Sequence, residues 1–143
     1  MTTAQRVFDL TMALMDEMSE SGATDTADTK EYKNRTLNIL NVLRGELYPY
    51  SDTYLDAETG KRPIAIVIQN FTDEIALDDY ICQSILPYGL AAHLLLDENP
   101  SSASFFQQKY DELKAGLARG MPKTSEDIED IYGGFSHCEF GRW

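Results

Sequence analysis

The chain has 143 residues, 43% hydrophobic and 25% charged, which is the size and composition of one soluble globular domain. Its formal net charge of −12 argues against direct nucleic-acid binding, because phosphate recognition needs clustered Lys and Arg; it favours a basic protein partner instead. Cys82 and Cys138 form neither a disulfide framework nor a CxxC metal motif. With no basic leader and no apolar run near the ~20 residues of a membrane span, we expect a soluble cytosolic product.

The hydrophobic pattern predicts an all-α fold of about four helices, with one short extended segment and an extended carboxy-terminal arm. The first helix is expected from Thr3 to Ser19, where four apolar residues follow a three-four spacing: Val7, Leu10, Leu14 and Met18. Gly22 is the expected left-handed terminator. The second helix is expected from Thr29 to about Leu47, because Asp28 and Glu31 have the spacing of a capping box.

Residues 48–68 lack the helical pattern of the segments on either side. Residues 48–63 contain two prolines, a glycine and several turn formers, which predicts a loop. Residues 64–68 (IAIVI) are the only β-like run. One short strand cannot make a sheet, so this run either packs against the helices or is completed by another copy of the chain.

Two further helices are expected in residues 77–120. The third begins at Asp78 or Asp79, continues to Glu98, and is apolar on nearly every side, so it must be buried. Pro87 lies within it and predicts a kink between Gln83 and Pro87. The fourth begins at the Asn99–Pro100 pair and ends near Gly120, and its apolar seam consists of Ala103, Phe106, Tyr110, Leu113 and Leu117. Residues 1–122 then form a helical domain, and 123–143 an acidic, aromatic arm.

No arrangement of residues in the sequence predicts catalysis. His93 and His137 lack a second histidine at helical spacing, and no HExxH, GxSxG, P-loop or GxGxxG motif is present. The Asp78–Asp79 pair is better explained by helix capping than by paired acids. We therefore expect no enzyme activity, no metal and no cofactor.

Aromatic and β-branched residues in irregular segments are the better candidates for function, because such side chains often anchor partner proteins. The residues expected at a protein interface are Tyr48, Tyr50, Tyr54, Ile64, Ile66, Ile68, Tyr132, Phe135, Phe140 and Trp143.

The carboxy-terminal half resembles a known family. The matching stretches are LDD (77–79), LPYGLAA (86–92), LLDENP (95–100), FFQQKYDEL (105–113), IEDIYGG (128–134) and FGRW (140–143). They are similar to small helical head–tail connector, or head-completion, proteins of tailed phages and prophages of Gram-positive bacteria. The resemblance covers residues 73–143, about half of the chain.

The resemblance implies a structural role in virion assembly. Connectors of this family form a ring between the portal and the tail and extend the DNA channel. The expected partners are further copies of the chain, the portal protein and a tail or tail-completion protein, without sequence-specific nucleic-acid binding and without a membrane. The expected location is the head–tail junction of the virion, and the host cytoplasm during assembly.

The main alternative is an acidic DNA-mimic or inhibitor protein of a mobile element. Such a protein would use its net charge of −12 to bind a basic host protein. A small hydrolase or metal enzyme would need a His or Cys constellation that the sequence does not contain.

Overall fold

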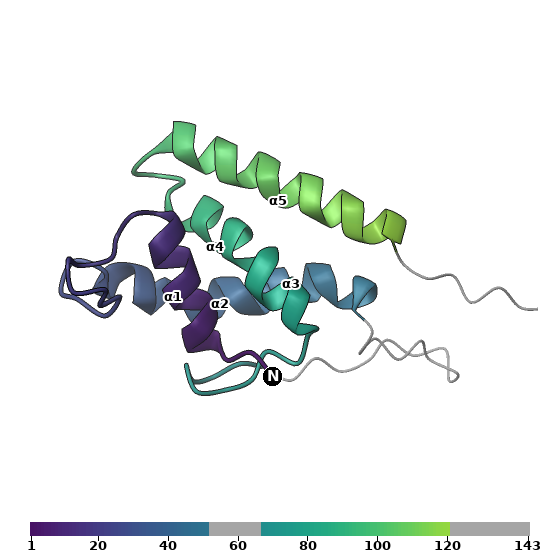
Figure 1. Cartoon of the computed structure of the whole chain (residues 1–143), viewed down its shortest axis with the longest axis horizontal. Helices are drawn as coiled ribbons and strands as arrows, with labels where there is room; N and C mark the ends of the chain where they lie inside the picture. The colour runs from purple at the N-terminus through teal and green to yellow at the C-terminus, as the bar shows by residue number, and fades with distance from the viewer. Residues whose placement is uncertain (52–66, 121–143) are drawn as a thin grey trace, which may run out of the picture.

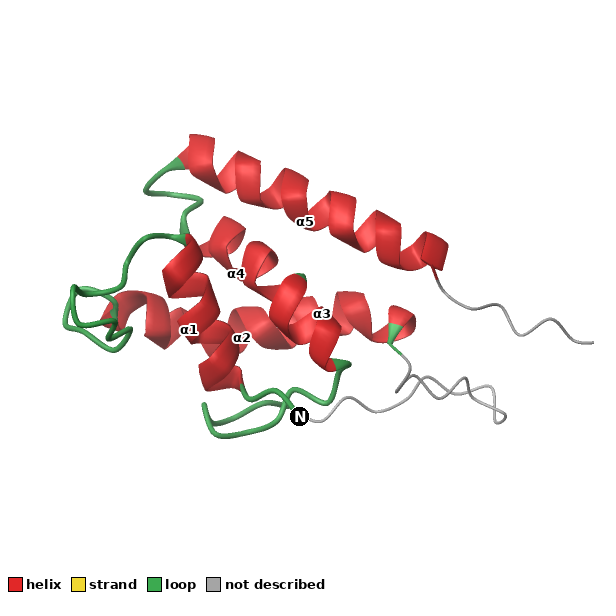
Figure 2. Cartoon of the chain, in the orientation of Figure 1, coloured by secondary structure: helices red, strands yellow, loops and turns green. Residues whose placement is uncertain are grey.

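A computed structural model describes residues 1–51 and 67–120 (Figure 1). These residues form five α-helices and one 3₁₀ helix: α1 (Ala4–Leu14), α2 (Lys30–Leu47), η1 (Tyr48–Tyr50), α3 (Asp79–Ser84), α4 (Leu86–Leu94) and α5 (Pro100–Gly120). The expected all-α class is confirmed, and within the described ranges the only β pairing is an isolated antiparallel bridge between Thr3 and Glu74 (Figure 2). Residues 64–66 of the β-like run and the arm at 123–143 lie outside the described residues.

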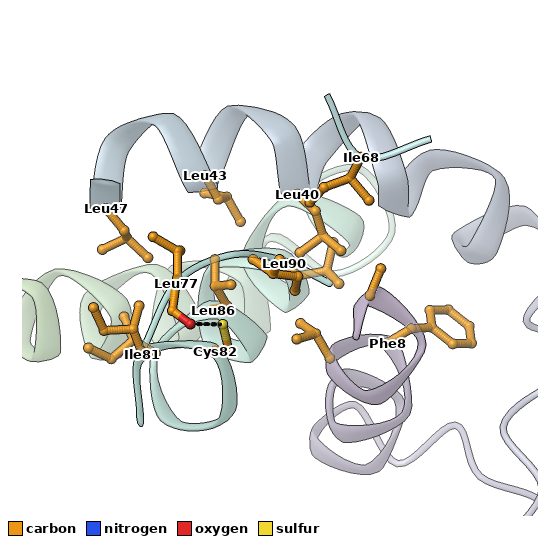
Figure 3. Close-up of a cluster of buried hydrophobic side chains, with 14 of the residues drawn as sticks. Phe8, Leu40, Leu43, Leu47, Ile68, Leu77, Ile81, Cys82, Leu86 and Leu90 are labelled. Atoms are coloured by element: carbon orange, nitrogen blue, oxygen red, sulfur yellow. Dashed lines mark hydrogen bonds between the residues drawn. The ribbon is translucent and has the colours of Figure 1, made fainter. Parts of the chain in front are cut away.

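Helix α4 lies at the centre of the molecule and packs against α1, α2, α3 and α5. Seven of its nine residues are buried, as its nearly continuous apolar sequence predicts. Figure 3 shows how the core forms around it: Leu40, Leu43 and Leu47 of α2 face Leu86 and Leu90 of α4. Burying a leucine of this kind contributes about 1.5–3 kcal/mol to folding, so this cluster is the main source of stability.

The expected third helix is divided into two. Helix α3 ends at Ser84, and α4 begins at Leu86 with Pro87 in its first turn, where a helix does not need the missing N–H. The helix is therefore interrupted at Ile85, within the range of the predicted kink. Helix α4 ends at Leu94 and not at Glu98, because a turn closed by the Asn99 N–H on the Leu95 carbonyl leads into the next helix.

The end of α1 differs from the prediction. The helix stops at Leu14 instead of Ser19, and the residue in the left-handed region is Asp16 (φ 58°). The N–H of Asp16 bonds the Ala13 carbonyl and the N–H of Glu17 bonds the Met12 carbonyl, the two hydrogen bonds of a Schellman motif. Gly22 (φ 81°) also has a positive φ, but it lies in the following loop and does not terminate the helix.

The predicted N-cap residue is confirmed at α5 and is wrong at α2. Asn99 Oδ1 accepts the N–H of Ser102 at 3.2 Å, which is the expected N-cap bond of α5. At α2 the N-cap is Thr29 rather than Asp28, and its side chain makes no capping hydrogen bond. The buried Thr29 hydroxyl accepts the Thr26 N–H at 3.0 Å instead, so it stabilises the preceding loop.

Helix α5 lies on α4 through the predicted seam. Ala103, Phe106 and Tyr110 are buried in the interface, and Leu113 and Leu117 are half-buried. The Tyr110 hydroxyl donates to Glu46 Oε2 at 2.9 Å, which attaches α5 to α2 as well.

Candidate interaction surfaces

The structure describes three of the ten residues expected at an interface. Tyr48 and Tyr50 lie in η1, directly after α2; both are half-buried, and Tyr48 packs against the core. Their interface role stays a prediction. The other seven lie outside the described residues: Tyr54, Ile64, Ile66, Tyr132, Phe135, Phe140 and Trp143.

Ile68 is the third described residue of those expected at an interface, and it belongs to the core. Its side chain is only 4% exposed. The Asn41 side chain of α2 holds its backbone from both sides: Oδ1 accepts the Ile68 N–H at 2.8 Å, and Nδ2 donates to the Ile68 carbonyl at 3.0 Å. Asn41 thus satisfies the two backbone groups that a neighbouring strand would otherwise satisfy. For this residue the structure supports packing against the helices, the first of the two options left open above.

Cys82 is the free cysteine in the described part of the chain. The Cys82 thiol is buried and donates to the Leu77 carbonyl at 3.7 Å, and burial raises its pKa to about 12, so it stays protonated at neutral pH (Figure 3). Within residues 1–51 and 67–120, no three His, Cys, Asp or Glu side chains could hold one metal ion together. None of the helices there is long and apolar enough to cross a bilayer.

Internal contacts occupy several of the basic side chains. Lys33 Nζ lies 2.6 Å from Asp25 Oδ1 and 4.7 Å from the centroid of the Phe71 ring. Arg35 donates to the Leu94 carbonyl at 3.4 Å, and Arg44 is only 6% exposed. The described residues include 16 acidic and 8 basic side chains, so acidic groups outnumber basic ones there.

Two tyrosine hydroxyls also donate to the carboxylates of exposed glutamates. Tyr32 donates to Glu98, and this hydrogen bond, with burial second, raises the pKa of Tyr32 to about 12. Burial and the hydrogen bond to Glu46 raise the pKa of Tyr110 as well. Both bonds tie the α4–α5 hairpin to α2, so the hairpin and α2 are held in one arrangement.

An apolar groove of about 430 Å³ opens between α1, the α3–α4 junction and α5. We call it the α1–α5 groove; its lining residues are Leu10, Ala13, Leu14, Gln83, Ser84, Pro87, Tyr88, Lys109 and Leu113. Leu14 is 38% exposed there, although the sequence pattern placed it on the buried face of α1. Helix α1 instead buries the face that contains Ala4, Val7, Phe8, Thr11 and Met12.

A second groove, of about 650 Å³, lies between the end of α4 and the first half of α5. We call it the α4–α5 groove. Asp111 and Glu112 line it, together with the exposed residues His93 and Leu96. Lys109 of α5 lines the α1–α5 groove instead. The charged lining residues of the two grooves therefore differ in sign.

Sequence reasoning missed these surfaces because the residues that form them resemble core residues. The described large apolar side chains that are exposed are Met1, Leu14, Met18, Val42, Val67, Tyr80, Leu96 and Phe105. A usable signal was present in α1, where apolar residues cover more of the helix than one buried face can accommodate. Phe105 of α5 is also exposed and lies outside the predicted seam, but it lines neither groove.

Comparison with protein-family models, with curated proteins and with solved structures found no match.

Proposed function

We propose that the protein is a non-enzymatic component of virion assembly, a head–tail connector of a tailed phage or prophage. Copies of the chain would form a ring between the portal and the tail and extend the channel through which DNA passes. The proposal rests on the resemblance in residues 77–113, a stretch that in this fold is the central helix α4 with its neighbours α3 and α5.

The observation that favours a ring is that the charged residues lining the two grooves of the hairpin differ in sign. A closed ring needs a heterologous interface, in which each subunit presents two different surfaces to its two neighbours. Asp111 and Glu112 line the α4–α5 groove, and Lys109 lines the α1–α5 groove. Complementary charges of this kind set the orientation of neighbouring subunits more than they add affinity.

The net charge is also suited to a DNA channel. Acidic side chains repel phosphate, so a channel with acidic walls lets DNA slide without binding it. The site of action would be the head–tail junction of the virion, with the host cytoplasm as the place of assembly.

Electron microscopy of the full-length chain mixed with its portal protein tests the proposal. We expect closed rings of the chain on the portal, coaxial with its channel. A chain that stays monomeric and does not bind the portal would refute the proposal.

One observation favours a second candidate, an acidic inhibitor that binds a basic host protein. Acidic side chains outnumber basic ones two to one in the sequence, and Arg44, one of the basic residues, is only 6% exposed. An inhibitor of this kind would capture a basic nuclease or DNA-binding protein and would be missing from purified virions. A connector would be found in the virions.

A further inference from the structure

The α1–α5 groove differs in charge from the rest of the surface. In a chain with twice as many acidic as basic residues, no acidic side chain lines this groove, and Lys109 is its only charged lining residue. By the same four-residue spacing Arg6 lies beside Leu10 on α1 and Asp9 lies beside Ala13, where Asp9 accepts hydrogen bonds from Gln5 and Thr24. The groove thus combines apolar walls with positive charge, which suits a segment that is apolar on one face and acidic on the other.

The chain itself contains such a segment. Residues 126–132 read EDIEDIY: Ile128, Ile131 and Tyr132 have the i, i+3, i+4 spacing of one helix face, and the other four residues are all acidic. These residues lie outside the described part of the structure, in the 23 residues that follow Gly120. Seven residues of α5, about 10 Å of helix, separate the groove residue Leu113 from Gly120. The five residues 121–125 span at most about 17 Å, so chain length permits the segment to reach its own groove or that of a neighbour, and the proposed ring favours the neighbour.

We propose that the α1–α5 groove of one subunit binds residues 126–132 of the neighbouring subunit. The inference rests on the proposed ring and identifies one of its contacts. Ile128, Ile131 and Tyr132 lie against the apolar walls, and the flanking carboxylates approach Lys109. Each subunit gives one segment and receives another, and a ring satisfies every segment and every groove in this way. The α4–α5 groove is a poorer site for this segment, because Asp111 and Glu112 repel it.

Photo-crosslinking in the full-length chain tests this contact. A benzoyl-phenylalanine replaces Tyr132, isotopically heavy and light chains are mixed, and rings are assembled on the portal before irradiation. We expect crosslinks between heavy and light chains that map to Leu10, Leu14 or Tyr88. The same probe at Tyr80, which is 62% exposed and outside the groove, should give none there. Links within a single chain, or links to other surfaces, would overturn the inference.

Charge reversal provides an independent readout. Lys109→Glu should raise the chain concentration needed for half-assembly by about tenfold, because it replaces attraction by repulsion in the groove. Lys30→Glu makes the same charge change at an exposed position outside the groove and should leave assembly unchanged. Combining Lys109→Glu with Asp127→Lys and Glu129→Lys should restore assembly. Equal behaviour of the Lys109 and Lys30 variants would contradict the inference.

These results separate the inference from the function on which it rests. Rings that form on the portal without crosslinks to the groove leave the connector function intact and remove only this contact. The absence of rings with the unmodified chain would remove both.

Discussion

Replacement of Gly89 by alanine probes the packing on which the α4–α5 hairpin depends. Gly89 lies in the middle of α4 and is buried under α5. A Cβ at this position would lie 2.9 Å from Cδ2 and Cε2 of the Tyr110 ring and 3.1 Å from a methyl carbon of Leu43. The ring has little freedom to move, because Tyr110 is 2% exposed and its hydroxyl is bonded to Glu46 at 2.9 Å.

Two opposing effects determine the size of the change. Alanine is a better helix former than glycine by about 1 kcal/mol, which favours the variant. Inserting a methyl group into a closely packed core costs about 1–3 kcal/mol. We therefore expect Gly89→Ala to lower the free energy of unfolding by up to about 2 kcal/mol.

Gly45 and Gly116 provide matched controls. Both lie in helices, both are exposed, and a Cβ at either would meet no atom within 4 Å. Gly45→Ala and Gly116→Ala should each raise the free energy of unfolding by up to about 1 kcal/mol. The difference between these variants and Gly89→Ala then measures the cost of the close contact between the added methyl group and the Tyr110 ring.

Urea unfolding followed by circular dichroism measures these differences. The double variant Gly89→Ala/Tyr110→Leu should show a favourable coupling of about 1 kcal/mol, because removing the ring makes room for the added methyl group. If Gly89→Ala stabilised the protein as much as the two controls do, the packing of α5 on α4 described above would be wrong.

Three further predictions concern stability. Asp16→Gly should raise the free energy of unfolding by about 0.5–1 kcal/mol in urea titrations, because glycine tolerates a positive φ; a loss of stability would contradict the Schellman geometry. In the same assay Asn41→Ala should lower the free energy of unfolding by about 1–3 kcal/mol, because the N–H and carbonyl of Ile68 lose their partners. Asn38→Ala, at an exposed position of the same helix, should change it little, and equal effects of the two variants would refute the role of Asn41. The thermal melting temperature should decrease as the pH rises from 10 to 12, because unfolded tyrosine ionises near pH 10 whereas folded Tyr32 keeps its proton to about pH 12. Tyr32→Phe should make this decrease smaller, and an unchanged pH profile would argue against the bond to Glu98.

The sequence was most informative where one strong local signal decided the structure. The limits of α2 and α5 followed from their apolar stripes and, for α5, from the Asn99–Pro100 start. Pro87 predicted the break before α4, because no helix interior accommodates a residue without an N–H at low cost.

The sequence was misleading where tertiary contacts overrode a local pattern. The stripe through Leu14 and Met18 continues past the end of α1, but a left-handed Asp16 ends the helix and leaves Leu14 in the wall of a groove. Local patterns do not specify which of two apolar faces finds a partner, so the α1–α5 groove was not predicted. The same reason explains Ile68, whose backbone partner is the distant Asn41.

The central claim is that copies of this chain form a ring on a portal. Its most direct test is the mass and symmetry of the complex formed by the full-length chain and the portal protein, measured by native mass spectrometry and electron microscopy. The account predicts a closed ring of chains, coaxial with the portal. A chain that keeps the mass of a single subunit, with or without the portal, would contradict it.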